Sequence, residues 1–349
     1  MMKSKLLLAA IVMTVITSCT NKKVLTKNYA LNDVEIKLVE IKSIPNKTLN
    51  DIDITRLYQM KLINSKYLIL VDRAATDRGI QILDIENFTV LGQTGIKGEG
   101  PQEISNYSEL IPFNDGFLMT DYAKKVIYYY DVKEAIADSN YLPVTYGPLK
   151  TFLSSLRITE GDQYIGTQLG MSETVQGALE VNLVKGDITK ERCDIFTPHY
   201  NEISGIQTSM DPSKLLCYVE KGDDRISVAY TPYDFLAIYN TNGELIRTIK
   251  GEKTLKKRET HCYFRHAQFT PNDLFVDHQT AAIYKKNKMG KMQYEGYNTI
   301  LCFDKNGAYH KTLKTDHAFD QYVVLPNKKE IILYRANSDN PFTTTEFSL

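Results

Sequence analysis

Three aspartates hold equivalent places in the sequence, each near the end of a short apolar run: Asp72, Asp121 and Asp277. Two carboxylates that face each other across ~5–9.5 Å can hydrolyse a glycosidic bond, one as the acid and the other as the nucleophile or base. An aspartate at the end of a strand is also a common turn cap, because its side chain accepts hydrogen bonds from nearby backbone N–H groups. The recurrence favours turn caps, so we assign no catalytic residue.

The histidines are a second source of chemistry, since five of the six fall between His261 and His317. A metal site needs several ligands that converge on one point. His261 and His266 are five residues apart and would face opposite sides of a regular strand. His266 and His278 would have to meet at a channel mouth to bind a metal, and the scatter of the histidines favours loop and surface positions. We therefore predict no metal site and no cofactor.

The segment from Gly95 to Glu103 is rich in glycine and invites comparison with a phosphate-binding loop. It lacks the Gly-Lys-Ser/Thr ending of such loops, and it leads into a strand, so no helix N-terminus is present to hold phosphate. We interpret it as a crossover between strands, stiffened by Pro101, with Glu103 as a candidate at a channel mouth. Serine-hydrolase elbows and His-Glu-x-x-His motifs are also missing from the sequence.

The N-terminus has the layout of an export signal. Two lysines precede the apolar run Leu6–Ile16, which is too short to span a bilayer because spanning takes about 20 residues. The run ends in Ile16-Thr17-Ser18-Cys19, which resembles the lipobox of bacterial lipoproteins, whose cysteine is acylated. We predict a signal peptide over 1–18 and a lipidated linker over 19–30, with lipidation at Cys19. The alternative is an ordinary signal peptide.

Four further cysteines and the charge balance constrain the mature protein. Its 42 basic and 42 acidic residues cancel, which argues against nucleic acid as a partner because such binding needs an excess of Lys and Arg. An exported protein may form disulfides, and four cysteines allow three pairings. No Cys-x-x-Cys spacing supports a zinc or redox site, so we expect mostly free, buried thiols and leave the pairing open. The four are Cys193, Cys217, Cys262 and Cys302.

Short β-rich runs broken by turn residues dominate the chain after residue 30. A run that ends in Asp or Asn, then a turn, then another run recurs in a fixed order. The recurring residues lie 47, 56, 53 and 64 positions apart, and they are Asp84, Asp131, Asp187, Asn240 and Asp304. Asn-Gly at 242–243 and at 306–307 predicts tight hairpin turns.

The repeat predicts the architecture. A step of about 55 residues suits a four-stranded blade, and six such steps fill the chain after Cys19. We therefore predict an all-β, six-bladed β-propeller over 31–349. The alternating segment 33–41 is the predicted N-terminal strand that completes the last blade and closes the ring. The rival architecture, a pair of β-sandwich domains, does not explain a steady step.

The lipobox, the repeat and the segment Gly98-Glu99-Gly100-Pro101-Gln102-Glu103 together resemble the TolB-like six-bladed β-propeller lipoproteins of Bacteroidetes. The resemblance covers roughly residues 30 to 340. It implies a cell-envelope location and a propeller architecture, and it implies little chemistry.

Residues that begin the inner strands of a propeller line its channel, so they are the predicted ligand-binding candidates. These are Arg56, Glu103, Tyr107, Arg157, His266 and Tyr322. We expect a binding module for a small molecule, glycan or protein at one face of the ring. The alternatives are a carbohydrate-active hydrolase or lyase with Asp or His at the channel mouth, and a structural envelope component.

The predicted location is the outer membrane, held there by the N-terminal lipid. The predicted mature start, Thr20-Asn21-Lys22-Lys23, lacks acidic residues. In Bacteroidetes lipoproteins an acidic stretch at this place resembles a surface-export signal, so its absence favours the periplasmic face. The protein or glycan partner is left open.

Overall fold

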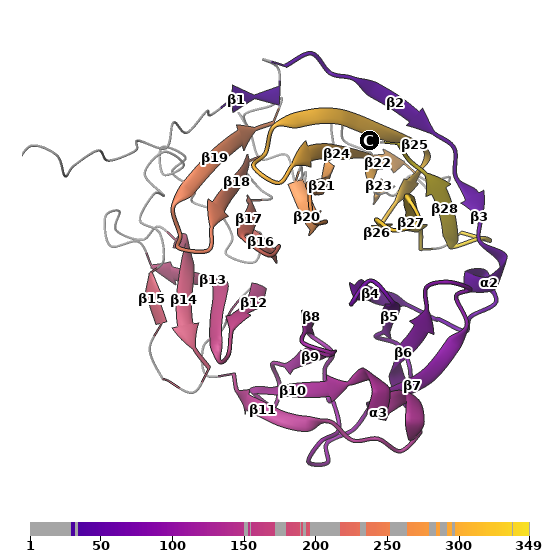
Figure 1. Ribbon diagram of the computed structural model, residues 1–349. Helices are drawn as coiled ribbons and strands as arrows, with labels where there is room; N and C mark the ends of the chain where they lie inside the picture. Colours follow the sequence, from indigo (N-terminus) through magenta and orange to yellow (C-terminus); the bar gives the residue numbers. More distant parts are fainter. Residues whose placement is uncertain are drawn as a thin grey trace, which may run out of the picture.

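The computed structural model describes the greater part of the chain after residue 28, in fourteen stretches. They are 29–31, 34–149, 153, 155–171, 179–188, 190, 193–195, 217–230, 235–251, 264–278, 284–286, 292–294, 297–336 and 338–348. The predicted signal peptide, Cys19, His261 and Cys262 lie outside the described residues. The described chain is all-β apart from two short helices, and its sheets stand around a central axis as the blades of a ring (Figure 1).

The first three blades are four-stranded antiparallel sheets in which the strands follow the chain from the axis outwards. Blade 1 holds β4 (Leu57–Ile63), β5 (Tyr67–Asp72), β6 (Arg78–Asp84) and β7 (Val90–Ile96). Blade 2 holds β8 (Glu109–Phe113), β9 (Gly116–Asp121), β10 (Val126–Asp131) and β11 (Val144–Pro148). Blade 3 holds β12 (Ser155–Glu160), β13 (Gln163–Met171), β14 (Leu179–Asp187) and β15 (Cys193–Ile195).

The other three blades also run outwards from the axis, with the outermost strand of blade 6 supplied by the N-terminal segment, so the predicted number of six blades is confirmed. Blade 4 holds β16 (Cys217–Lys221), β17 (Arg225–Tyr230), β18 (Phe235–Asn240) and β19 (Leu245–Lys250). Blade 5 holds β20 (Phe264–Phe269), β21 (Asp273–His278), β24 (Tyr297–Asp304) and β25 (Tyr309–Phe319), with the side hairpin β22 (Tyr284–Lys286) and β23 (Met292–Tyr294). Blade 6 holds β26 (Gln321–Leu325), β27 (Glu330–Tyr334) and β28 (Phe342–Glu346).

The N-terminal segment runs along the outer rim of blades 4 to 6 (Figure 1). It adds β1 (Tyr29–Ala30) to β19, β2 (Leu38–Ile41) to β25 and β3 (Ile44–Pro45) to β28. Helix α2 (Lys47–Asn50) leads from this segment to blade 1, and helix α3 (Val132–Ala137) follows β10. The described strand of the alternating segment 33–41 thus pairs with blade 5 and not with the last blade, because two residues, Lys42 and Ser43, carry the chain on to β3, which pairs with blade 6.

The residues that mark the repeat in the sequence lie at turns and act as caps there. All five close the third strand of their blade. In four blades the side chain accepts a hydrogen bond from the backbone N–H two residues later, at 2.6 to 3.0 Å, and these residues are Asp84, Asp131, Asn240 and Asp304. Gly243 and Gly307 take φ of +84° and +80° in the two predicted Asn-Gly turns. The repeat is thus visible in the sequence because these four blades use the same local turn chemistry.

The hydrophobic core is divided among the blade interfaces. Among the described residues, five clusters of buried side chains each join two neighbouring blades, namely 1 with 2, 2 with 3, 4 with 5, 5 with 6 and 6 with 1. The N-terminal segment places one aliphatic side chain in each of the last three: Leu31 between blades 4 and 5, Ile41 between 5 and 6, and Leu49 between 6 and 1. This segment therefore packs into three consecutive interfaces from outside.

Candidate functional site

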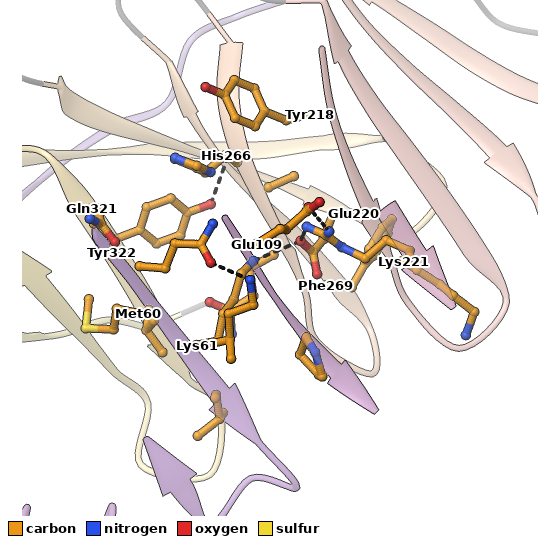
Figure 2. Close-up of a pocket in the computed structure, with 18 of the residues that line it drawn as sticks. Met60, Lys61, Glu109, Tyr218, Glu220, Lys221, His266, Phe269, Gln321 and Tyr322 are labelled. Carbon is orange, nitrogen blue, oxygen red and sulfur yellow. Dashed lines mark hydrogen bonds and ion pairs between the residues drawn. The ribbon is translucent and has the colours of Figure 1, made fainter. Parts of the chain in front are cut away.

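A cavity of about 490 Å³ occupies the axis of the ring and is lined by residues of all six blades (Figure 2). Its lining extends from residues that begin inner strands, such as Tyr218 and His266, to residues beyond their other ends, such as Asn64 and Pro326. The cavity is therefore a channel along the inner strands. A volume in the range of ~300–1,000 Å³ is typical of small-molecule sites.

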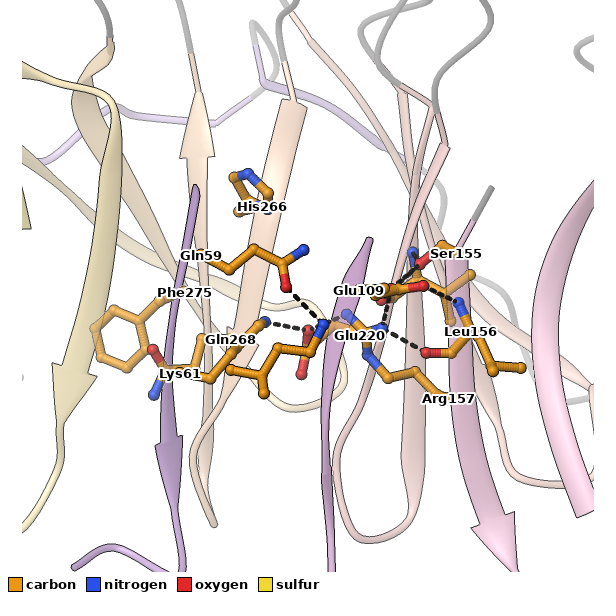
Figure 3. Close-up of polar contacts among 12 residues, drawn as sticks. Gln59, Lys61, Glu109, Ser155, Leu156, Arg157, Glu220, His266, Gln268 and Phe275 are labelled. Carbon is orange, nitrogen blue, oxygen red and sulfur yellow. Dashed lines mark hydrogen bonds and ion pairs between the residues drawn. The ribbon is translucent and has the colours of Figure 1, made fainter. Parts of the chain in front are cut away.

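The middle of the channel holds four charged side chains from four different blades (Figure 3). Nη1 of Arg157 in β12 lies 2.5 Å from Oε1 of Glu109 in β8. The other terminal nitrogen, Nη2, lies 2.9 Å from Oε2 of Glu220 in β16. Lys61 in β4 completes the network, with Nζ 3.0 Å from the same oxygen of Glu220. We call these four residues the charged layer.

The contact between Lys61 and Glu220 crosses the lumen. Lys61 belongs to blade 1 and Glu220 to blade 4, and in a ring of six blades these two lie opposite each other. Arg157 pairs instead with carboxylates of its two neighbouring blades. The charged layer thus divides the channel into a side that contains the strand starts and a side that contains the strand ends.

Burial acts differently on the two carboxylates of the charged layer. Burial raises the pKa of Glu109 above its ordinary 4.5, although Arg157 and the backbone N–H of Leu156 act in the opposite direction. Burial acts on Glu220 in the same sense, but Lys61 and Arg157 together hold the pKa of that carboxyl below its ordinary value. Glu109 is therefore the carboxylate that accepts a proton more readily as the pH falls.

Aromatic side chains form the wall on the strand-start side of the charged layer. The rings of Tyr218 and His266 lie with their centroids 4.8 Å apart. Tyr322 stands beside them, and its hydroxyl donates to the carbonyl oxygens of Phe275 at 2.8 Å and His266 at 3.2 Å. Burial raises the pKa of Tyr322 well above its usual range, so this hydroxyl remains a neutral donor. Figure 2 shows the rings of Tyr218 and His266 above Glu109 and Glu220, and the ring of Tyr322 to the left of the two glutamates.

Polar side chains of the inner strands also fasten each blade to the next. In five of the six junctions a side chain of one inner strand bonds to the backbone of the following one, counting the described residues. The side chains are Gln59 to Leu110, Glu109 to Leu156, Ser155 to Val219, Gln268 to Val324 and Gln321 to Tyr58. We call this set the inner belt. Glu109 is its one ionisable member, and it also belongs to the charged layer.

The six predicted candidates separate into two groups. Arg157, His266 and Tyr322 line the channel and lie together there, whereas the other three are not among its lining residues. Arg56 immediately precedes β4, where its backbone N–H donates to Asp72. The structure thus brings together the three candidates that lie within inner strands.

Tyr107 and Glu103 lie in the crossover that precedes β8. The hydroxyl of Tyr107 is buried between blades 1 and 2, where it donates to the carbonyl of Gly95 at 2.5 Å and accepts from the N–H of Gly79 at 3.0 Å. Burial raises the pKa of Tyr107 to about 12. The carboxylate of Glu103 turns back to accept from the N–H of Gly100 at 2.7 Å. Both side chains therefore hold the crossover in place.

Two of the three recurring aspartates, Asp72 and Asp121, are turn caps, as predicted, and all three bind the chain that enters the inner strand. The carboxylate of Asp72 accepts from the backbone N–H groups of Thr55, Arg56 and Ala74. Asp121 accepts from Ser105, Asn106, Ala123 and Lys124 in the same way, and Asp277 accepts from His266. Each aspartate thus fastens the chain that enters an inner strand to the end of the second strand.

The remaining predicted features are placed as follows. His278 is fully buried and packs against Phe264, with ring centroids 4.5 Å apart and the ring planes tilted by 38°. No group of three or more potential metal ligands occurs within the described stretches. Of the cysteines whose side chains the structure describes, Cys302 is free and buried. No helix in the described part is long and apolar enough to cross a membrane.

The ring and its channel define a six-bladed β-propeller. No protein-family model and no curated protein matches the chain. A solved structure of a DUF4221-family member from Bacteroides vulgatus is similar, with a TM-score of 0.53 at 10% identity over 90% of this chain and 98% of that one. A Bacteroides fragilis structure named as an exported protein has a TM-score of 0.50 at 14% identity over 88% and 98%. These likenesses show the fold.

Lys61, Glu109 and Glu220 are the site residues that the sequence did not single out. Each lies in the innermost strand of its blade, and their pairing joins positions up to 159 residues apart. A polar residue at an inward position of an inner strand is the signal that would have found them.

Proposed function

We propose that the protein is an exported, lipid-anchored propeller of the TolB-like type that binds a polar small molecule or a glycan in its central channel. One observation carries the proposal: a channel of about 490 Å³ combines a charged layer in its middle with an aromatic wall on one side. Aromatic faces offer contact area at low entropic cost, and charged groups fix the orientation of a polar ligand.

The sequence motif around Cys19 supports the anchor, and the described N-terminal segment supports closure of the ring from outside. The Bacteroides fragilis neighbour that is named as exported agrees with a place in the cell envelope. Replacing Cys19 with Ala should move the protein from the membrane fraction to the soluble fraction. Unchanged fractionation would contradict the anchor and leave the channel proposal standing.

The hydrolase alternative receives no support from the carboxylates of the channel. Glu109 and Glu220 both bind the guanidinium of Arg157, so neither is placed as an acid opposite a separate base. The three recurring aspartates are occupied by backbone N–H groups. Binding without turnover is the function that this geometry favours.

A ligand screen tests the proposed function. Full-length protein in detergent is heated with a panel of glycans and small metabolites, and the midpoint of thermal unfolding is recorded. A ligand at 100 times its Kd stabilises the native state by about 2.7 kcal/mol. For the 319 residues after residue 30, an unfolding entropy of ~2.1 cal/mol/K per residue converts this into a rise of about 4 °C.

Two variants locate the binding. Tyr218→Ala removes one ring of the aromatic wall and should abolish the rise, whereas Tyr146→Ala removes a ring that lies outside the channel lining and should leave it unchanged. Hits that respond equally to both variants would show that the ligand binds elsewhere.

A further inference from the structure

The charged layer contains one contact that a ligand can replace at little cost. Oε2 of Glu220 is shared, because it lies 3.0 Å from Nζ of Lys61 and 2.9 Å from Nη2 of Arg157. If Lys61 moves away, Glu220 keeps its pairing with Arg157 and stays neutralised. The lysine side chain is 21% exposed, against 9% for the arginine, so Lys61 is the cation of the charged layer that a molecule in the lumen can reach.

The charge of the channel also selects the sign of the ligand. Among the described lining residues, Lys61, Arg157 and Lys221 oppose Glu109 and Glu220, which leaves an excess of one positive charge before any contribution from His266. A ligand with one negative charge cancels this excess. A cation would add to it, and a dianion would leave an unpaired negative charge in a confined site, where uncompensated charge is costly.

We propose that the channel binds a carboxylate-bearing saccharide, whose acid group takes the place of Glu220 on Lys61 while its ring contacts Tyr218 and His266. This inference rests on the proposed function and specifies its ligand. A carboxylate has the same shape and charge as the group it displaces, so the ammonium of Lys61 exchanges one partner for an equivalent one. The aromatic wall lies on the strand-start side of the layer, within the same cavity.

The site should also take up a proton when the acid binds. Glu109 faces Arg157 and Glu220, with Lys61 across the lumen and Tyr122 nearby. Burial raises the pKa of Glu109, and an added carboxylate in the channel would raise it further. Affinity for the acid should therefore increase as the pH falls from 8 towards 5.

The test compares two probes that differ by one charge: galacturonic acid, which carries a single carboxylate, and its methyl ester. Titration calorimetry on the full-length chain in detergent should show the acid binding at least tenfold more tightly than the ester. Lys61→Gln should remove this preference. Glu220→Gln should strengthen binding of the acid several-fold, because the ligand then has no carboxylate of the protein to displace from Lys61.

Lys133→Gln serves as the matched control, since its side chain is 73% exposed on α3, outside the channel lining. The unfolding midpoint of each variant is measured first, so that a loss of fold is not taken for a loss of binding. Equal affinity for acid and ester in the parent chain, or a preference that survives Lys61→Gln, overturns the inference. If Tyr218→Ala abolishes binding of neutral saccharides in either case, the proposed function stands without it.

Discussion

Replacing Arg157 with Met tests the energetics of the charged layer. The guanidinium is almost fully buried and contacts both Glu109 and Glu220. After the substitution Glu220 keeps Lys61 at 3.0 Å, whereas Glu109 retains only the N–H of Leu156 and the hydroxyl of Ser155. Removing one partner from a buried ion pair costs about 3–5 kcal/mol, because the other charge is left uncompensated.

The loss of stability caused by Arg157→Met should depend on pH in a definite direction. The pKa of Glu109 is already raised by burial, and loss of Arg157 raises it further. A carboxyl whose pKa is higher in the folded state than in the unfolded state contributes stability that is present at low pH and is lost as the pH rises through the folded pKa. The deficit of the Arg157→Met variant should therefore be largest near pH 8 and should shrink as the pH falls towards 5.

Differential scanning calorimetry measures this directly. With an unfolding entropy of ~2.1 cal/mol/K for each of the 319 residues after residue 30, a cost of 3–5 kcal/mol lowers the midpoint by about 4–7 °C at pH 8. Adding Glu109→Gln to the variant should restore most of the loss and remove its pH dependence. A deficit that is equal at pH 5 and pH 8, or a double variant no better than the single one, would refute the reasoning.

Two further substitutions test the packing of the ring. Leu49→Ala removes a fully buried side chain between blades 6 and 1. Such a truncation costs about 2–5 kcal/mol, so the midpoint of thermal unfolding should fall by roughly 3–7 °C. An unchanged midpoint would show that the N-terminal segment does not hold this interface. Tyr107→Phe leaves the N–H of Gly79 and the carbonyl of Gly95 without their buried partner. The free energy of unfolding should fall by about 1–3 kcal/mol, which urea unfolding would show as a lower midpoint with the same slope. Equal midpoints would mean that the hydroxyl has no structural role.

The sequence predicted the number of blades because the signal of each blade is local. Asp84 and Asp304 cap their turns through residues only two positions away, so the same residue types recur in the same order in the blades that use this cap. The N-terminal strand was predicted by its alternation, but alternation does not identify the partner. Which blade receives residues 38–41 depends on the path of the whole segment around the rim, and they pair with β25.

The channel was predicted less completely for a geometric reason. Arg157, His266 and Tyr322 were correctly placed near the starts of inner strands. A residue just before a strand turns with the incoming loop, as Tyr107 does between two blades. Residues within the strand, such as Arg157 and His266, point into the lumen. The ion pair across the lumen joins blades 1 and 4. The spacing of residues along the chain does not indicate which side chains meet there.

The inner belt accounts for the composition of the charged layer, because Glu109 belongs to both. At the junctions held by Gln59, Ser155, Gln268 and Gln321, a neutral side chain suffices to bind the backbone of the next blade. Glu109 also binds the backbone of the next blade, but its side chain is charged, and a buried carboxylate needs a neighbouring cation. Arg157 supplies that cation, its second arm engages Glu220, and Glu220 in turn reaches Lys61 on the opposite side of the ring. A ligand that takes Lys61 therefore acts on a network that also joins blades 2 and 3, so binding in the channel and stability of the ring should change together.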